Sequence, residues 1–323
     1  MRDAASAASL GLVLHRVLTS ALIRAAELIA LLLVVGTVLF FLLRLAGDPA
    51  AVLAGQGATP EQIIAIRQAY GLDGPLLAQY LTYLRQLAVL DFGTSLASGE
   101  PALGKVLHHL PVTLLLASAA LALSILLGLG TGVFLGARTG RNDGRIASLL
   151  LFVVQGVPGY VVALLLINLF AVQLHWLPPF GVVNWRGWFL PTLALAAFLA
   201  PKIARVTAAN LQEALREDYV RLAYATGAAP RTVLWRHALP NALLGATALA
   251  GTQLAFLLSG SVVTESIFVV PGMGWLLIQS ARSLDFPVLQ ALTAVVATMV
   301  FLINLGTDAL FRHLDPRLRK QQR

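Results

Sequence analysis

The sequence has no cysteine and few charged residues. Of its 323 residues, 12% are Asp, Glu, Lys or Arg, whereas a soluble domain carries about a quarter. Without cysteine the chain can form no disulfide, zinc–thiolate site or thiol nucleophile. Hydrophobic residues make up 58% of the chain and the mean hydropathy is +0.80. Most of the surface must therefore face something other than water, which predicts an integral membrane protein in contact with the lipid bilayer.

The sequence contains several long hydrophobic runs. A membrane-spanning helix needs about 20 apolar residues, because the hydrocarbon core is about 30 Å thick. Two of the runs reach this length only if Arg24, Lys202 and Arg205 extend their charged ends to the membrane surface. We therefore predict an all-α fold of about six transmembrane helices. They lie near 25–45, 111–137, 146–172, 188–207, 240–263 and 287–310.

The positive charges indicate how these helices are oriented. The net charge is +8, which in a soluble protein would suggest nucleic acid as a partner. Cytoplasmic loops of membrane proteins collect Lys and Arg, and most of the 23 fall on one set of connections if the N-terminus is inside. We expect both termini in the cytoplasm and no nucleic-acid partner. The first span exceeds the apolar core of a cleaved signal peptide, about 7–15 residues, so we expect it to be retained.

One transmembrane domain, 25–310, accounts for the chain between a cytoplasmic segment 1–24 and a cytoplasmic tail 311–323. An outer insertion, 46–108, and a polar cytoplasmic loop, 208–239, interrupt it. In the insertion, Thr59 can cap a helix that begins at Pro60, and Glu61 suits the start of a helix. We expect one or two short helices there.

The segment 99–106, GEPALGKV, fits the pattern G-x-x-x-x-G-K of a phosphate-binding loop. Such a loop also needs Ser or Thr after the Lys and a strand before it, but Val106 follows Lys105. We expect the chain to hydrolyse no nucleotide itself and to be no enzyme. The six histidines are scattered, and we expect neither a metal nor a cofactor.

The middles of the predicted spans hold no ionisable residue, although such residues usually mark ion-coupled transporters. An autonomous ion-coupled carrier would need buried carboxylates, and an intramembrane hydrolase would need a nucleophile and base; the sequence indicates neither. We therefore expect a partner to supply the energy. Four polar residues could line a path or bond between helices: Gln155, Asn168, Gln253 and Asn304.

Three glycines, Gly128, Gly132 and Gly136, recur every four residues in the second span. This spacing places them on one face, where small residues allow membrane helices to approach closely. We favour packing within the chain over an interface between subunits.

The loop before the fifth span reads DYVRLAYATGAAPRTVLWRHALPNALL, 218–244. We predict a first helix from about Glu213 to Thr226, with Tyr219 and Leu222 on one face. Gly227 would end this helix and Pro230 would open the next. A helix that merely lay on the membrane surface would not require the sharp glycine break, so the loop is better suited to dock a soluble partner.

Residues 221–240 resemble the EAA loop of ABC-importer permeases. That loop runs E-A-A, three residues, Gly, nine residues, an aliphatic residue, one residue, Leu-Pro, and every spacing is kept here. Arg221 and His237 replace the Glu and the aliphatic residue, as in the dipeptide, oligopeptide and nickel branch, and Leu222 replaces the middle Ala. Further segments resemble the first permease subunit of the same importers: 47–50, 70–84, 91–96, 110–117, 157–181, 264–290 and 304–319.

The resemblance implies a type I importer permease in a bacterial or archaeal inner membrane. It would pair with a second homologous permease, bind ATP-binding-cassette ATPase subunits and receive solute from an extracytoplasmic solute-binding protein. It leaves open whether the solute is a dipeptide, an oligopeptide, a nickel chelate, glutathione or a sugar. The residues it assigns to ATPase coupling are Asp218, Tyr219, Arg221, Ala223, Gly227, Leu239 and Pro240.

Overall fold

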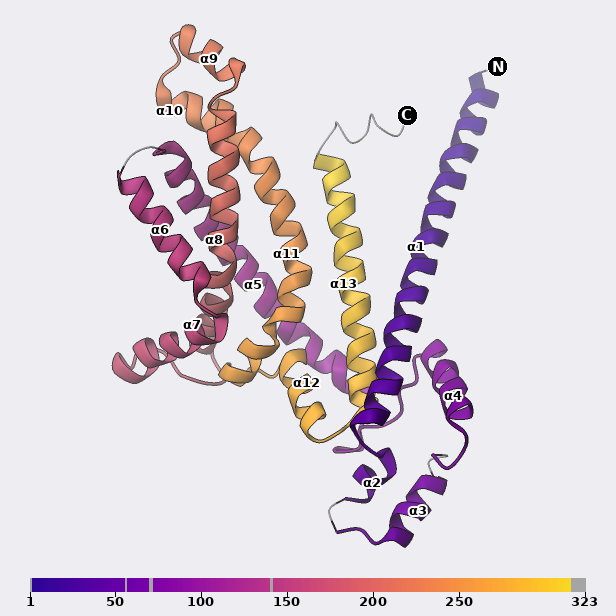
Figure 1. The fold of residues 1–323 in the computed structure, drawn as a ribbon. Helices are drawn as coiled ribbons and strands as arrows, with labels where there is room; N and C mark the ends of the chain where they lie inside the picture. Colours follow the sequence, from indigo (N-terminus) through magenta and orange to yellow (C-terminus); the bar gives the residue numbers. More distant parts are fainter. Residues whose placement is uncertain (1, 56, 70–71, 140–141, 315–323) are drawn as a thin grey trace. The chain divides into compact units, whose positions relative to one another are not determined.

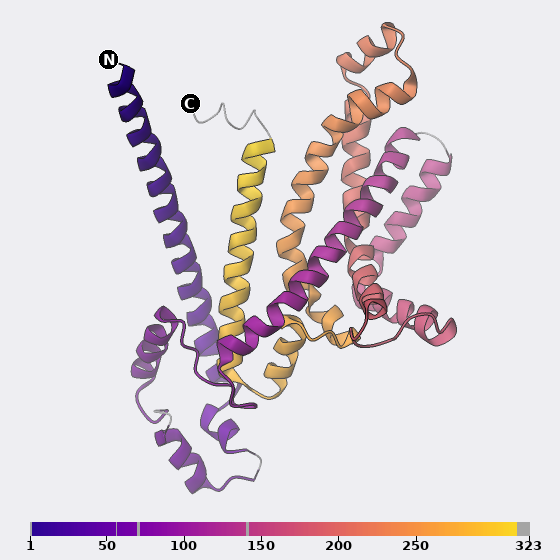
Figure 2. The same ribbon diagram turned by 180° about the vertical axis from the view of Figure 1, so that it is seen from behind.

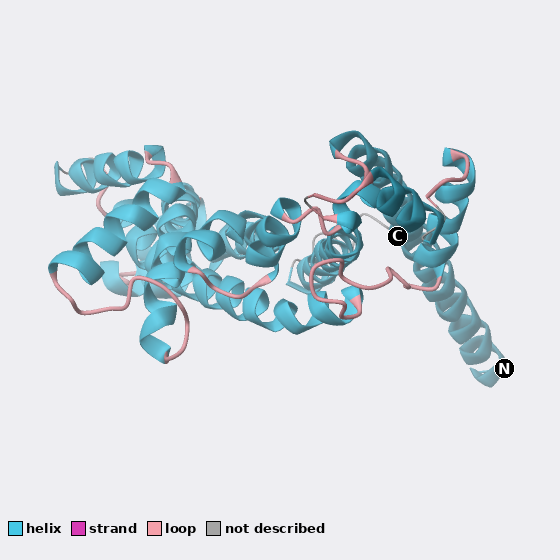
Figure 3. Cartoon of the chain, turned by 90° about the horizontal axis from the view of Figure 1, so that it is seen from below, coloured by secondary structure: helices cyan, strands magenta, loops and turns pink. Residues whose placement is uncertain are grey.

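The computed structural model describes residues 2–55, 57–69, 72–139 and 142–314. Within these ranges the chain is helical, and the β pairing consists of a single bridge between Thr94 and Pro101 (Figure 3). The α-helices are α1 Arg2–Ala46, α2 Pro49–Ala54, α3 Pro60–Ala69, α4 Leu76–Ala88, α5 Ala102–Ala137, α6 Asn142–Gly156, α7 Gly159–Leu166, α8 Phe189–Ala214, α9 Asp218–Ala225, α10 Pro230–Thr232, α11 Leu239–Phe268, α12 Met273–Arg282 and α13 Phe286–Leu314. A π-helical segment Ile167–Gln173 (η1) extends α7, a 3₁₀ turn Trp185–Trp188 (η2) precedes α8, and a π-helical segment Val233–Ala238 (η3) joins α10 to α11.

Five of the six expected spans fall on continuous helical segments, and the span 146–172 is divided between two, which confirms the all-α membrane fold. Among the described residues, five helices are long and apolar enough to cross a membrane: Ala21–Leu45, Ala102–Ala137, Trp185–Ala214, Pro230–Leu258 and Phe286–Ala309. The number rises to 7 if two bent pairs each count as one span.

The expectation of one continuous span at 146–172 is wrong. The chain bends by 100° between Asn142–Gly156 and Gly159–Gln173. Pro158 lies in the break, with an extended backbone at φ −57° and ψ 139°. A proline also pushes the residue before it out of the helical region. A proline inside the apolar run therefore divides it into α6 and α7.

The chain forms two compact units. The first combines the chain up to Val106 with Ser280–Phe301, and the second combines Leu107–Gln279 with the part of α13 from Leu302 onward.

The core of the first unit lies where α4 packs against α1. Gly36 on α1 leaves room for Tyr83 of α4, since a Cβ at this glycine would lie 2.5 Å from the Tyr83 hydroxyl. Phe40 is 1% exposed and contacts the rings of both Tyr80 and Tyr83 at 5.3 Å between centroids. The Thr37 and Tyr80 hydroxyls are 2.6 Å apart and share a hydrogen bond. An aromatic cluster with one polar contact thus fixes α4 on α1.

Asp285, directly before α13, holds a second set of contacts together in the first unit. Its side chain is buried, and it accepts hydrogen bonds from the Ser95 hydroxyl and from the backbone N–H of Leu96 at 3.0 Å. Lys105 donates to the Ser95 and Ser98 hydroxyls at 3.3 and 3.0 Å. The segment 91–96 is therefore tied to the start of α13 across 190 residues of sequence.

Among its described residues, the insertion 46–108 holds three short helices, α2, α3 and α4, and not the one or two expected. The predicted start of α3 is confirmed. Pro60 is its first residue, Glu61 lies in its first turn, and the Thr59 hydroxyl accepts from the Gln62 N–H at 3.4 Å. The Gln62 side chain accepts in return from the Thr59 N–H at 2.9 Å, which is the reciprocal arrangement of a capping box.

The second unit is organised around α8. Fourteen of its residues are buried, from Leu190 to Ala214. Figures 1 and 2 show α8 between α6 and α11, with α9 and α10 beyond one end of these helices. A membrane helix buried on most of its faces packs by close contact, because lipid supplies no hydrophobic force between helices.

The glycine face of α5 packs on α8, so the preference for packing within the chain is confirmed. A Cβ on Gly128, Gly132 or Gly136 would lie 2.7, 2.6 or 2.9 Å from the nearest side-chain atom of Ile203, Thr207 or Leu211, respectively. The three partners recur every four residues on α8, as the glycines do on α5. The two backbones therefore approach along several turns.

We expect Gly132→Ala to destabilise the protein more than Gly130→Ala. The new methyl of Gly132→Ala would lie 2.6 Å from the Thr207 side chain and 2.7 Å from the Ala204 carbonyl oxygen. Overpacking of this kind costs about 1–3 kcal/mol in the free energy of unfolding. Nothing lies within 4 Å of a Cβ at Gly130, which makes it the matched control. Thermal unfolding of the purified protein in detergent measures both, and equal melting temperatures for the two variants would contradict the packing of α5 on α8.

Candidate functional site

The loop between α8 and α11 begins with a turn that the sequence did not indicate. We predicted a first helix from about Glu213, but α8 itself continues to Ala214 and α9 starts only at Asp218. The prediction was wrong at this end because helix-forming residues continue through the turn, and nothing in their spacing marks the break. Glu217 takes an extended conformation, φ −66° and ψ 150°, directly before α9.

One face of α9 rests on a small apolar core. Val220 is fully buried and Ala223 is 8% exposed. Both belong to one cluster with Leu211, Ala214, Val233, Ala238 and Ala242. The cluster joins α9 to the ends of α8 and α11, so the loop has a fixed shape of its own.

The opposite face of α9 is open. Tyr219, Leu222 and Tyr224 are 39%, 64% and 46% exposed. The side chains of Asp218 and Arg221 are 96% and 75% exposed and form an ion pair at 3.4 Å. Exposed ion pairs of this kind contribute little to stability. A short polar helix that presents two tyrosines and a leucine to solvent is typical of a surface that binds another protein.

Gly227 ends α9 as predicted. Its φ is +87°, in the left-handed region that glycine adopts without steric cost. The Gly227 N–H donates to the Tyr224 carbonyl at 3.0 Å, and the Ala228 N–H donates to the Ala223 carbonyl at 3.0 Å. These two bonds make a Schellman motif. Nothing lies within 4 Å of a Cβ built at Gly227, so its outer side is open.

The return to the membrane begins at Pro230, the first residue of α10, as predicted. A π-helical segment, η3, then leads into α11 at Leu239. Leu239 is 8% exposed, and Pro240, which is exposed, has no N–H to donate to the preceding turn. Pro240 thus lies where the π-helical hydrogen bonding of η3 changes to the α-helical hydrogen bonding of α11.

Asn241 is a contact residue that sequence reasoning missed. Its side-chain amide donates to the Tyr219 hydroxyl at 3.0 Å and to the His237 carbonyl at 3.3 Å. It joins the exposed face of α9 to the first turn of α11. Its position directly after the Leu-Pro pair is the only signal in the sequence.

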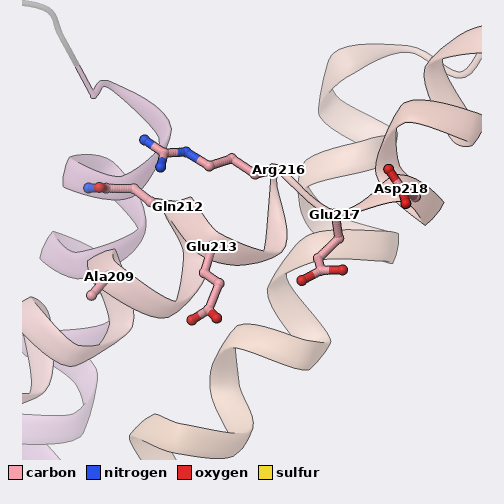
Figure 4. Close-up of a pocket in the computed structure, with 6 residues that line it drawn as sticks. All are labelled: Ala209, Gln212, Glu213, Arg216, Glu217 and Asp218. Atoms are coloured by element: carbon pink, nitrogen blue, oxygen red, sulfur yellow. The ribbon is translucent and has the colours of Figure 1, made fainter.

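A cavity of about 390 Å³ lies at the junction between the end of α8 and the start of α9. It is lined by Ala209, Gln212, Glu213, Arg216, Glu217 and Asp218 (Figure 4). Figure 4 shows the Glu213 and Glu217 side chains directed to the same side. Three carboxylates and one guanidinium give this hollow a negative charge, and of its residues the sequence analysis had named only Asp218 and the helix start at Glu213.

The expectation that the membrane part holds no buried carboxylate is wrong. Glu265 is fully buried on α11, which runs five residues beyond the predicted span end to Phe268. One carboxylate oxygen accepts from the Thr113 and Ser261 hydroxyls at 2.9 and 2.8 Å. The other accepts from the N–H groups of Gly274 and Trp275 at 2.7 and 3.1 Å.

The Glu265 carboxylate satisfies the start of α12. The first N–H groups of a helix have no partner within it, and here Met273 donates to the Thr113 hydroxyl at 2.7 Å while the next two donate to Glu265. A carboxylate has about four acceptor positions, and four donors occupy them. The group therefore fixes the 80° bend between Gly260–Phe268 and Met273–Arg282 and leaves no acceptor for a transported ion.

These features define a class: a multi-pass helical membrane protein with a polar loop of short helices between two of its spans. The comparisons with known proteins give the family. The model of the binding-protein-dependent transport system inner membrane component matches residues 108–320, and the model of the N-terminal part of such membrane components matches 15–117. The chain belongs to this family, the inner-membrane permease subunits of ABC importers, which work with ATPase and substrate-binding partners.

Curated relatives match over nearly their whole length. The chain is 36% identical over 305 residues to protein y4tP of Sinorhizobium fredii, named a probable peptide ABC transporter permease, covering 92% of this chain and 97% of that protein. It is 35% identical over 295 residues to the glutathione transport system permease protein GsiC of Escherichia coli K12, covering 90% and 96%.

Solved structures share the fold. The MetNI methionine ABC transporter in an inward-facing conformation matches with a TM-score of 0.58 at 20% identity, over 67% of this chain and 99% of that one. An amino acid ABC transporter matches with a TM-score of 0.53 at 19% identity, over 65% and 94%.

We expect Glu265→Gln to destabilise the protein. The glutamine side chain would place an N–H₂ donor against groups that are themselves hydrogen-bond donors. Loss of hydrogen bonds to a buried charged group lowers the free energy of unfolding by on the order of 3 kcal/mol. Thermal unfolding in detergent should show a melting temperature lower by several degrees. Glu61→Gln, on exposed α3, is the control, and an unchanged melting temperature for Glu265→Gln would contradict the capping role.

Proposed function

We propose that this chain is the permease subunit of an importer for peptides or a related small solute, and that it pairs with a second homologous permease. The names of two relatives, a probable peptide permease and a glutathione permease, support the solute class. The observation that carries the coupling role is the exposed face of α9, Tyr219, Leu222 and Tyr224, held on a buried apolar base.

The loop 208–239 is the coupling element in this proposal. Asp218, Tyr219 and Arg221 contact the ATPase directly from the exposed face of α9. Ala223 and Leu239 act from beneath, because both are nearly buried and hold α9 and the start of α11 in place. Gly227 and Pro240 set the two changes of backbone direction.

The partner ATPase hydrolyses ATP, and this chain does not. The segment GEPALGK supports this. Pro101 precedes the start of α5 at Ala102, and Lys105 donates to two serine hydroxyls of its own unit. The sequence that resembles a phosphate-binding loop is thus part of the polar contacts around Ser95.

We expect Gly227→Leu to abolish solute uptake and to weaken ATPase association, while membrane insertion stays intact. Two effects contribute. Any non-glycine residue at φ +87° costs roughly 1–2 kcal/mol. A leucine side chain would also project into the open space beside Gly227, where we place the ATPase.

Gly227→Ala separates the two effects, since it has the same backbone cost with only one methyl group. We expect it to retain more association and uptake than Gly227→Leu. Co-purification of the ATPase and uptake in proteoliposomes measure both variants. Normal ATPase stoichiometry together with normal uptake for Gly227→Leu would overturn the coupling assignment.

The proposed topology places both termini and the loop 208–239 in the cytoplasm. We expect reporter fusions after Arg141 and near Arg231 to report the cytoplasm, and fusions near Gly74 and Arg282 to report the outside. The excess of Lys and Arg on the first set of connections is the physical reason. A cytoplasmic signal at Gly74 would contradict this topology.

A further inference from the structure

A second cavity lies within the membrane part of the second unit, among α7, α8 and α11. Its volume is about 230 Å³. The lining is mostly apolar and includes Tyr160, Phe198, Phe256, Gly260, Val263 and Thr264. Tyr160, Phe256 and Val263 are 53%, 48% and 53% exposed, so the cavity opens to the outside of this chain.

Lys202 lies at this cavity although it does not line it. Its ammonium group is 4.0 Å from the centroid of the Phe198 ring and 5.0 Å from that of Phe256. These two rings stack on one another, 5.8 Å apart and 15° from parallel, and both line the cavity. The ammonium group of Lys202 is therefore held against the two aromatic rings that line one side of the cavity.

Lys202 lies within the candidate span Trp185–Ala214. Its side chain lies over Phe198, one turn toward the start of α8, since side chains of a helix point toward its N-terminus.

Lys202 has no anionic partner among the described residues of this chain. Glu27, Asp48, Asp143 and Asp218 pair with arginines, and the contacts of the ammonium are the two aromatic faces. Aromatic faces attract a cation but do not neutralise its charge. A cation within a membrane span is rare and marks a substrate or ion pathway.

We propose that this cavity is a solute subsite, in which one apolar residue of the transported solute occupies the cavity and a carboxylate of the solute binds Lys202. This rests on the proposed function. Pockets that hold a whole drug-sized ligand measure about 300–1,000 Å³, so a cavity of about 230 Å³ receives one residue and not a whole peptide. The subsite therefore selects for an apolar side chain next to a free carboxylate.

Photolabelling tests the subsite directly. The importer, assembled with its partner permease and ATPases in lipid nanodiscs, is exposed to the dipeptide alanyl-photoleucine, whose diazirine side chain is about the size of leucine. The same dipeptide with a C-terminal amide is the matched probe. We expect the acid to label α8 and α11 next to the cavity, alanyl-leucine to compete, and the amide to label about tenfold less, as loss of one charge-assisted hydrogen bond implies.

Three variants assign the effect to the residues named. Lys202→Met should remove the difference between acid and amide, and Lys202→Arg should restore most of it. Gly260→Leu should prevent labelling by both probes, because a side chain at Gly260 lies beside Phe256 and fills the cavity without contact with Lys202. Gly130→Leu, which faces open space on α5, should label as the unmodified protein does.

Equal labelling by acid and amide in the unmodified importer would overturn the subsite. Labelling that oleate displaces but alanyl-leucine does not would assign the cavity to a lipid carboxylate and would also overturn it. Labelling confined to the other permease would have the same consequence. Failure of the chain to assemble with an ATPase would instead contradict the proposed function, so the two ideas fail separately.

Discussion

Lipid offers no hydrogen-bond partner to backbone groups that a broken helix sets free. This constraint explains the contacts at two places where a helix of this chain follows a break or a loop. At the bend between α11 and α12, Glu265 accepts from two N–H groups at the start of α12. Before α8, the Asn184 side chain accepts from the N–H groups of Arg186 and Gly187 at 3.0 and 3.3 Å. A polar side chain thus accepts from the free N–H groups at both places.

The loop 208–239 satisfies the end of its first helix with the backbone itself. The Schellman bonds at Gly227 satisfy the last carbonyls of α9, and the apolar face around Val220 and Ala223 anchors the helix. The exposed face of α9 carries aromatic and charged side chains that make few contacts within the chain, so they are available to a partner. A rigid base and an open face are the properties that a docking element needs, because less order must be created on binding.

The spans, the capped start of α3, the glycine face of α5 and the end of α9 at Gly227 could be predicted from the sequence. Each depends on a local pattern: an apolar run, a capping pair, a four-residue period or a glycine after a helix. The capping of α12 by Glu265 and the aromatic contacts of Lys202 could not be predicted this way. Glu265 acts on a helix start that is adjacent only after the chain bends, and the partner of Lys202 on α11, Phe256, is distant in sequence. The break at Pro158 could have been found, since a proline within an apolar run is itself a signal.

The hydrogen bond between Asn241 and the Tyr219 hydroxyl has a mechanical consequence. Asn241 stands in the first turn of α11, a helix of 30 residues and hence about 45 Å long. A displacement of α9 that keeps this bond must carry the near end of α11 with it. Because a helix is stiff over this length, a tilt of a few degrees at the loop moves the far end by several ångströms. A movement of α9 would thus be transmitted through the Asn241 side chain to the whole of α11. It would displace Phe256 and Gly260, and most of all Glu265 near the far end of the helix.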